Sequence, residues 1–436
     1  MASEWRIAPL GELYDFSSGL SKPREEFGFG HGFLSFKDVF YNYFAPENLE
    51  QLVNSTEKEQ QTCSIQRGDV FLTRTSETMD ELGMSCVALK SYERATFNGF
   101  TKRLRPKGST KIVPEYAGYY FRSPSFRREV TAMSSLSTRA SLNNEMLSRL
   151  KMVLPPVTTQ EAIGSILKAL DDKIELNRRM NATLEGMARA LFKSWFVDFD
   201  PVRAKLDGRK PEGMDKATAA LFPDGFEESS LGPVPKGWEV GKVHDCCVQI
   251  QNGGTPRRNE PRFWEGGTIP WLASGEVRQP IITATEGFIT EEGLAESSAK
   301  WVPAFSTVVA LYGATAGQVS FTSSRLTTNQ AVCALIPKKD YAFFNYLTMR
   351  CATNEMENKA VGSAQQNISK GIVEETQVVL PPITLVERFA ELANPLFDQW
   401  ISNLHQSRTL ATLRDTLLPK LLSGELSVAS IPKVKA

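Results

Sequence analysis

Two stretches that lie 226 positions apart decide the fold: VLPPVTTQE at residues 153–161 and VLPPITLVE at residues 379–387. In each, a pair of prolines precedes the pattern T-x-x-E. This pattern is a capping box, in which a Thr hydroxyl and a Glu carboxylate bind free amides at the start of a helix. The prolines end the preceding strand and direct the chain into the helix. Two such boxes in register behind a repeated Leu-Pro-Pro predict an internally duplicated chain.

A helix of about 37 residues is expected after each box, because apolar residues recur there at alternating steps of four and three. Narrow apolar seams need a partner, and the two helices are predicted to pair with each other as an antiparallel coiled coil about a pseudo-twofold axis. The expected pairing residues are Ile163, Leu167, Leu170, Asn177, Leu184 and Leu191 in the first helix, and Phe389, Leu396, Asn403, Leu410 and Leu417 in the second.

Two asparagines lie near the middle of the predicted helices, Asn177 in the first and Asn403 in the second. We expect them to hydrogen-bond across the seam and to fix its register, so that replacing both with Leu would raise stability and loosen the register. Two solvated asparagines are the alternative. Ile174 opposite Gln406 is the one expected pair that fits badly. Pro395 predicts a kink or break in the second helix.

The segments of roughly 145 residues before the helices also correspond, as short β-branched or aromatic runs between Gly, Pro and Asn. Residues 33–39 align with 271–277, and residues 98–104 align with 329–335. Residues 69–73 align with 307–311, which matches Arg74 with Tyr312. The predicted fold class is α+β, with two mixed α/β domains separated by the two long helices.

The predicted organisation has six segments along the chain. They are a first α/β domain at 1–152, a central helical repeat at 153–199, a linker at 200–237, a second α/β domain at 238–378, a C-terminal helical repeat at 379–426 and a tail at 427–436. One short helix is expected in the linker, at Lys216–Leu221.

The bulk composition is that of a globular protein, with 41% hydrophobic and 23% charged residues and a formal net charge of zero. No secretory signal and no membrane-spanning run is evident, and a cytoplasmic location is expected. The cysteines form no CxxC pair and indicate reduced core residues, with no metal site; they are Cys63, Cys86, Cys246, Cys247, Cys333 and Cys351.

Motifs of catalysis are not convincing. A methyltransferase cofactor loop follows a buried strand, whereas the glycine-rich run Phe27-Gly28-Phe29-Gly30-His31-Gly32 follows no predicted strand. The run 394–397 (NPLF) lacks the second proline of an amino-methyltransferase motif, and 313–317 (GATAG) lacks the lysine of a P-loop. The chain is therefore predicted to be no enzyme, and a self-contained adenine methyltransferase is disfavoured.

The whole pattern resembles the specificity subunits of type I restriction–modification systems. The stretches that carry the resemblance are residues 154–202, from LPPVTTQE to VDFDPV, residues 221–240 (LFPDGFEESSLGPVPKGWEV) and residues 413–426 (LRDTLLPKLLSGEL). The resemblance implies that the two α/β domains are target-recognition domains, each of which reads half of a bipartite site in double-stranded DNA, and that the helices set the distance between the two halves. It also implies two methyltransferase subunits that bind S-adenosylmethionine, and two restriction subunits that use ATP and Mg²⁺ where a system has them, while this chain needs no cofactor.

Candidate DNA contacts are side chains that can bind phosphates or base edges. They are Lys22, Arg24, Arg74, Lys102, Arg103 and Arg139 in the first domain, and Arg257, Arg258, Tyr312, Gln318, Gln365 and Gln366 in the second. Residues 94–139 are strongly basic, although a solvated surface explains this equally well.

A stand-alone bipartite DNA-binding or regulatory protein is the alternative function. The expected discriminating feature is surplus apolar surface on the helices for partner subunits, at Phe192, Trp195, Phe196, Phe397 and Trp400.

Overall fold

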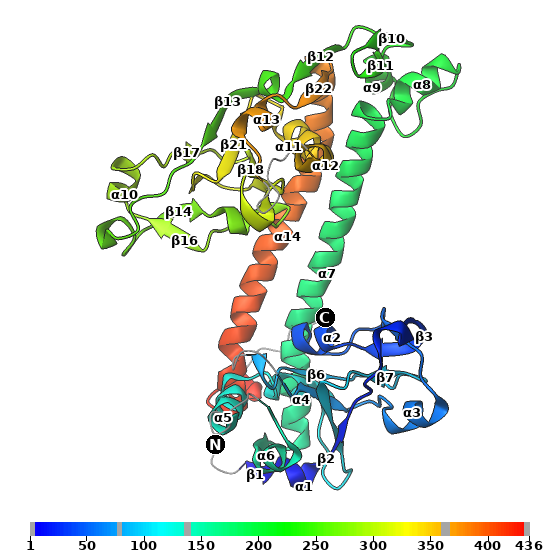
Figure 1. Ribbon diagram of the computed structural model, residues 1–436, viewed down its shortest axis with the longest axis vertical. Coiled ribbons are helices and arrows are strands. Elements are labelled where there is room, and N and C mark those ends of the chain that lie inside the picture. The colour runs from blue at the N-terminus through cyan, green and yellow to red at the C-terminus, as the bar shows by residue number, and fades with distance from the viewer. Residues whose placement is uncertain (1–4, 76–80, 135–140, 359–366, 431–436) are drawn as a thin grey trace. The chain divides into compact units, whose positions relative to one another are not determined.

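The computed structural model describes residues 5–75, 81–134, 141–358 and 367–430 (Figure 1). The chain divides into two compact units. Unit 1 combines residues 1–175 with 407–436, and unit 2 comprises residues 176–406. Both long helices, α7 (Val157–Phe196) and α14 (Ile383–Ser423), contribute residues to both units.

Unit 1 is built on small sheets flanked by short helices. Strand β1 (Arg6–Pro9) pairs antiparallel with β9 (Lys151–Leu154). The four-stranded sheet has the order β2 (Tyr14–Ser18), β8 (Thr101–Pro106), β5 (Val70–Thr73) and β6 (Ser85–Val87). The three-stranded sheet has the order β4 (Leu52–Val53), β3 (Phe27–Leu34) and β7 (Thr96–Phe97). The short helices are α1 (Leu10–Leu13), α2 (Phe36–Tyr41), α3 (Glu57–Thr62), α4 (Pro114–Tyr120), α5 (Pro124–Ser134) and α6 (Asn144–Arg149).

Unit 2 repeats this arrangement with additional strands. Strand β12 (Glu239–Lys242) pairs antiparallel with β22 (Gln377–Leu380). The five-stranded sheet has the order β13 (Cys247–Asn252), β21 (Val332–Pro337), β18 (Thr307–Ala310), β19 (Val319–Thr322) and β15 (Ile281–Ile282). The four-stranded sheet has the order β16 (Gly287–Ile289), β14 (Ile269–Leu272), β20 (Leu326–Thr328) and β17 (Trp301–Val302). Its short helices are α10 (Glu291–Ala295), α11 (Ala342–Cys351), α12 (Thr353–Asn358) and α13 (Lys370–Glu374).

The linker region belongs to unit 2 and holds two short helices and a hairpin. These are α8 (Asp200–Leu206), α9 (Lys216–Ala220) and the pair β10 (Phe226–Ser229) and β11 (Gly232–Pro235). Helix α9 confirms the short helix expected there, and Asp215 caps it by accepting from the Thr218 amide at 2.7 Å.

The internal duplication is confirmed by strand order. The order β2-β8-β5-β6 in unit 1 recurs as β13-β21-β18-β19 in unit 2, and the pair β1–β9 recurs as β12–β22. The predicted α+β fold class, with one mixed scaffold present twice, is therefore confirmed.

One part of the sequence alignment between the halves is wrong by one residue. The Arg74 amide donates to Phe100 O, and the Leu311 amide donates in the same way to Ala331 O. Leu142 N donates to Arg74 O as Ile368 N donates to Leu311 O. Arg74 therefore corresponds to Leu311, and Tyr312 corresponds to Thr75. Both stretches contain a run of three apolar residues, Val70–Leu72 and Val308–Ala310, so the hydrogen-bond register is needed to distinguish the two alignments.

The predicted capping boxes are also displaced. Helix α7 begins at Val157, so Thr158 already lies in the first turn, and the amides of Thr159 and Gln160 donate to Pro156 O. Likewise, the amides of Leu385 and Val386 donate to Pro382 O at the start of α14. The second proline of each pair thus occupies the N-cap position.

In unit 1 the first turns of α7 pack in one core with the last turns of α14. Ile163 and Leu167 of α7 are fully buried in one core with Leu418, Leu421 and Leu422 of α14, while Leu417 is partly buried against it. Leu170 and Leu410 are only half-buried. Near them Arg414 Nη1 lies 2.6 Å from Asp171 Oδ1, and Tyr119 Oη donates to Asp171 Oδ2 at 2.7 Å.

In unit 2 the remaining parts of α7 and α14 run antiparallel. Asn181 meets Asn403, and Phe192 further along α7 meets Phe389 near the start of α14, with ring centroids 5.9 Å apart. Leu184, Leu191 and Leu396 are partly buried against the same core. Helix α14 continues through Pro395, so it does not break there, and a kink at Pro395 stays a prediction.

The central asparagines do hydrogen-bond across the helices. Asn177 Nδ2 donates to Gln406 Oε1 at 2.8 Å and to Asn403 O at 3.4 Å. Asn403 Nδ2 donates to Asn181 Oδ1 at 2.9 Å. Gln406, which fitted badly against Ile174 in the expected pairing, is therefore a partner of Asn177.

The aromatic residues expected to be surplus surface on the helices are instead core. Phe192, Trp195, Phe196, Phe397 and Trp400 are all at most 6% exposed. They pack against residues such as Phe344 of α11 and Trp238. The expectation was wrong because the strands and short helices of unit 2 themselves cover this part of the helices.

Candidate nucleic-acid interface

In both units, candidate residues lie at the same edge of the largest sheet, which is β2-β8-β5-β6 in unit 1 and β13-β21-β18-β19-β15 in unit 2. Because neighbouring strands are antiparallel, the end of β2, the start of β8 and the end of β5 lie together in unit 1. In unit 2 the end of β13, the start of β21 and the end of β18 lie together in the same way. We call these the loop edges. They comprise residues 19–24, 74–75 and 98–102 in unit 1, and residues 253–258, 311–318 and 329–331 in unit 2.

Equivalent glycines place the first loop of each edge tightly against the neighbouring turn. A Cβ on Gly19 would lie 2.3 Å from Asn98 O, and a Cβ on Gly253 would lie 2.0 Å from Thr328 O. No side chain fits at either position, so the backbone approach itself requires glycine. Two basic residues follow each glycine: Lys22 and Arg24 follow Gly19, and Arg257 and Arg258 follow Gly253.

In unit 1, Lys22, Arg24, Arg74 and Lys102 belong to the loop edge. Lys22 Nζ lies 2.9 Å from Glu59, a residue whose pKa is lowered by hydrogen bonds from Thr56 and by Lys22. Arg24 is exposed, and Arg74 is half-buried. Lys102 Nζ donates to Ser18 Oγ at 2.9 Å, and burial and the nearby Arg74 lower the pKa of Lys102.

Arg103 points to the opposite face of β8 from Lys102, as successive strand residues do. It is 8% exposed, donates to Ser64 O at 2.6 Å and lies over the Phe97 ring. These contacts favour a structural role for Arg103 over DNA contact.

Much of the basic run at residues 94–139 is engaged in the fold. Arg105 binds Asp69 through two hydrogen bonds of 2.8 and 2.6 Å. Arg122 donates to the main-chain oxygens of Ser85, Val39, Phe40 and Asn42. Charge clustering in the sequence therefore overstates the basic surface of unit 1.

In unit 2, the loop edge carries Arg257, Arg258, Tyr312 and Gln318. Both arginines are exposed, and Arg258 lies over the rings of Trp264 and Trp271. Tyr312 is 43% exposed, and Gln318 is half-buried in the turn that joins β18 to β19. The remaining candidates, Arg139, Gln365 and Gln366, lie outside the described residues.

Two further residues of the loop edges were missed. Gln330 is exposed, and its Oε1 accepts a hydrogen bond from Thr255 Oγ1. Phe100 is 59% exposed at the corresponding turn of unit 1. The repeated turn was visible in the alignment of residues 98–104 with 329–335, which could have pointed to both.

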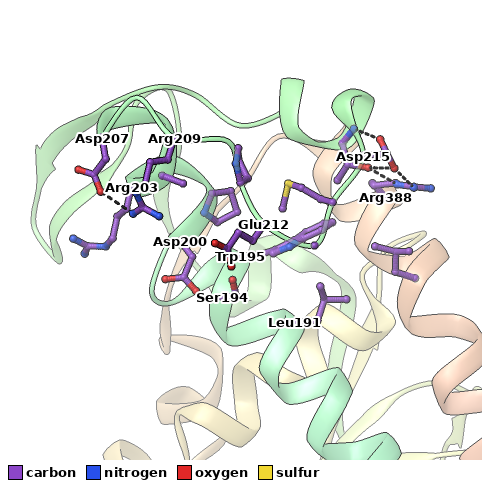
Figure 2. Close-up of a pocket in the computed structure, with 17 residues that line it drawn as sticks. Leu191, Ser194, Trp195, Asp200, Arg203, Asp207, Arg209, Glu212, Asp215 and Arg388 are labelled. Atoms are coloured by element: carbon purple, nitrogen blue, oxygen red, sulfur yellow. Dashed lines mark hydrogen bonds and ion pairs between the residues drawn. The ribbon is translucent and has the colours of Figure 1, made fainter.

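A separate cavity of about 650 Å³ lies in unit 2 between the end of α7, the linker and the start of α14 (Figure 2). Two of its three arginines have acidic partners: Arg388 lies 2.9 Å from Asp215 and Arg209 lies 2.8 Å from Asp207. The third, Arg203, donates from Nε to the main-chain oxygen of Asp198 at 2.8 Å. Asp200 and Glu212 add further negative charge to the lining. This cavity is therefore a poor site for phosphates.

Residues 27–32, the loop that resembles a cofactor site, form part of strand β3. No cluster of metal-ligating side chains occurs in the described ranges, and none of the helices described there has the length and apolarity needed to span a membrane. Five of the six cysteines are buried, as expected for core residues, whereas Cys351 is exposed.

The chain thus contains one fold twice, and the two copies carry different side chains on equivalent loop edges. The family model of the type I restriction modification DNA specificity domain matches residues 2–186 and again 235–388, and the chain belongs to this family. Among its relatives, the HindI specificity subunit of Haemophilus influenzae is 32% identical over 68% of this chain and 74% of its own length. The MjaIX specificity subunit of Methanocaldococcus jannaschii is 26% identical over 98% of this chain and 94% of its own.

A solved structure shares the fold. The S subunit of a type I restriction-modification system from M. genitalium matches with a TM-score of 0.57 and 12% identity, over 96% of both chains.

Proposed function

We propose that this chain is the non-catalytic DNA-recognition subunit of a type I restriction–modification complex. The observation that carries the proposal is a single scaffold present twice with different side chains on the same loop edge. A shared scaffold with unlike edges is what reading two different half-sites requires.

The chemistry of the loop edges supports DNA as the ligand. Exposed Arg24, Arg257 and Arg258 can bind phosphates or guanine edges, and Gln318 and Gln330 can bind adenine. Two separate edges of this kind fit a bipartite site in double-stranded DNA, with the helices setting the spacer.

We further propose that the helices bind methyltransferase subunits. Leu176, Met180 and Met187 of α7 recur at helical spacing and are 42%, 37% and 52% exposed. This stripe supplies the apolar surface that a stand-alone DNA-binding protein would not need. S-adenosylmethionine would be held by those partners, with ATP and Mg²⁺ in restriction subunits where the system has them. The complex would act where the DNA is, in the cytoplasm.

The test is to express the chain with its methyltransferase subunit in a host without methylation and to map the modified adenines. We expect one bipartite motif, which disappears when the specificity chain is omitted. Replacing Leu176, Met180 and Met187 with Gln should abolish co-purification of the methyltransferase, while DNA binding by the chain itself should be unchanged. Adenine methylation that does not depend on the chain would refute the proposal. DNA binding with no methyltransferase association would favour the stand-alone alternative.

A further inference from the structure

The loop at residues 253–258 of unit 2 is held by two tryptophans. Trp264 Nε1 donates to Arg257 O at 3.0 Å, and Trp271 Nε1 donates to Gly254 O at 2.9 Å. The two indole rings meet edge to face, with centroids 5.2 Å apart and planes at 89°. Trp271 is 3% exposed, so the core of unit 2 fixes this support.

Arg258 adds a third restraint to the loop. Its guanidinium lies 4.4 Å from the Trp264 ring centroid and 4.9 Å from that of Trp271. A cation held over two indole rings gains from both ring faces. The Glu260 amide also donates to Arg257 O at 3.2 Å, which closes a turn. The backbone on both sides of Arg257 is thus fixed.

The side chain of Arg257, by contrast, projects from this fixed backbone into solvent. No ion pair or side-chain hydrogen bond joins Arg257 to another described residue. The neighbouring Arg262 shows the opposite situation, since it faces the carboxylates of Glu260, Glu292 and Glu296. Among the described residues, Arg257 is the exposed arginine of this loop that neither pairs with a carboxylate nor lies over a ring, whereas Arg258 is held over Trp264 and Trp271.

We infer that Arg257 is a specificity-determining residue that reads a guanine, and that Arg258, Trp264 and Trp271 are its positioning residues. Arginine binds guanine O6 and N7 through two parallel hydrogen bonds, and a fixed backbone lowers the entropy lost when this geometry forms. This inference rests on the proposed function, because it assumes that the loop edge of unit 2 contacts DNA.

The experiment uses the full complex with the methyltransferase subunit and maps methylated adenines at single-base resolution. Arg257→Gln should relax one guanine position in one half-site, with discrimination falling roughly 5- to 150-fold, and should leave the other half-site unchanged. Arg257→Lys should relax the same position, because an ammonium lacks the two-pronged geometry. Arg258→Gln and Trp264→Phe should weaken discrimination at that same base and at no other.

The matched control is Arg325→Gln. Arg325 is also an exposed arginine of unit 2 stacked on a tryptophan, 4.4 Å from the Trp301 ring centroid. Its replacement should leave the motif unchanged, and thermal unfolding of all variants confirms folding.

Three outcomes overturn the inference. They are an unchanged motif in Arg257→Gln, a uniform loss of methylation that Arg257→Lys restores, as expected for a phosphate contact, and a relaxed base other than guanine. Absence of any sequence-specific methylation by the unmodified complex would instead refute the proposed function, so the two failures are distinguishable.

Discussion

Asp171 shows how a single residue ties a recognition domain to the helices in unit 1. It accepts from Tyr119 of α4 and pairs with Arg414 of α14, and the side chains of Asp171 and Arg414 are 21% and 17% exposed. Burial and the adjacent Asp171 raise the pKa of Tyr119, so the tyrosine stays a hydrogen-bond donor at all working pH values. One carboxylate therefore satisfies two groups from different elements.

We expect Asp171→Ala to lower the free energy of unfolding by about 1–3 kcal/mol, because Tyr119 would lose its hydrogen-bond acceptor and Arg414 would keep only Asp415 as a carboxylate partner among the described residues. Urea denaturation measures this change. The control is Asp172→Ala, which removes an exposed partner of Lys168 at helical spacing and should cost about 0.5 kcal/mol or less. Equal effects of the two substitutions would show that the Asp171 contacts contribute little.

At the scale of elements, the asparagine network of α7 and α14 changes the expectation for the seam. Each central asparagine has a polar partner on the other helix, so Leu at positions 177 and 403 leaves Asn181 and Gln406 without those partners. Asn181 is 8% exposed, and an unpaired buried amide costs about 1–3 kcal/mol. The double variant should therefore be less stable by this amount, in contrast to the gain that the sequence alone indicated.

Replacing Asn181 with Leu as well should recover the lost stability and loosen the helix register. Urea denaturation measures the first effect, and a mixture of spacer lengths among methylated motifs reports the second. A double variant that is already more stable than the parent would mean that the cross-helix amide bonds contribute nothing.

The sequence predicted the elements better than their faces. The repeated Leu-Pro-Pro and the 4–3 spacing located both helices, and the antiparallel pairing followed from their duplication. Which side of the helices is covered could not be predicted, because Phe192 and Trp400 are buried by parts of unit 2 that are distant in sequence. The loop edges were partly predicted from basic residues in glycine-rich loops, but Arg103 was placed among them, because residue type does not reveal strand facing.

For the whole molecule, the proposed role requires the helices to set the spacing between half-sites. Inserting seven residues, one heptad, lengthens a helix by about 10 Å, which corresponds to about three base pairs of DNA. The insertion has to keep the seam in register, so it belongs after Glu175 in α7 and after Arg408 in α14, between the Asp171–Arg414 and Asn181–Asn403 contacts. With both insertions, mapping of methylated adenines should show a spacer about three base pairs longer and both half-sites unchanged. Insertion in α7 alone puts the contacts out of register and should abolish methylation. Altered half-site bases in the double insertion would contradict a ruler, because base readout would then depend on the helices and not on the loop edges.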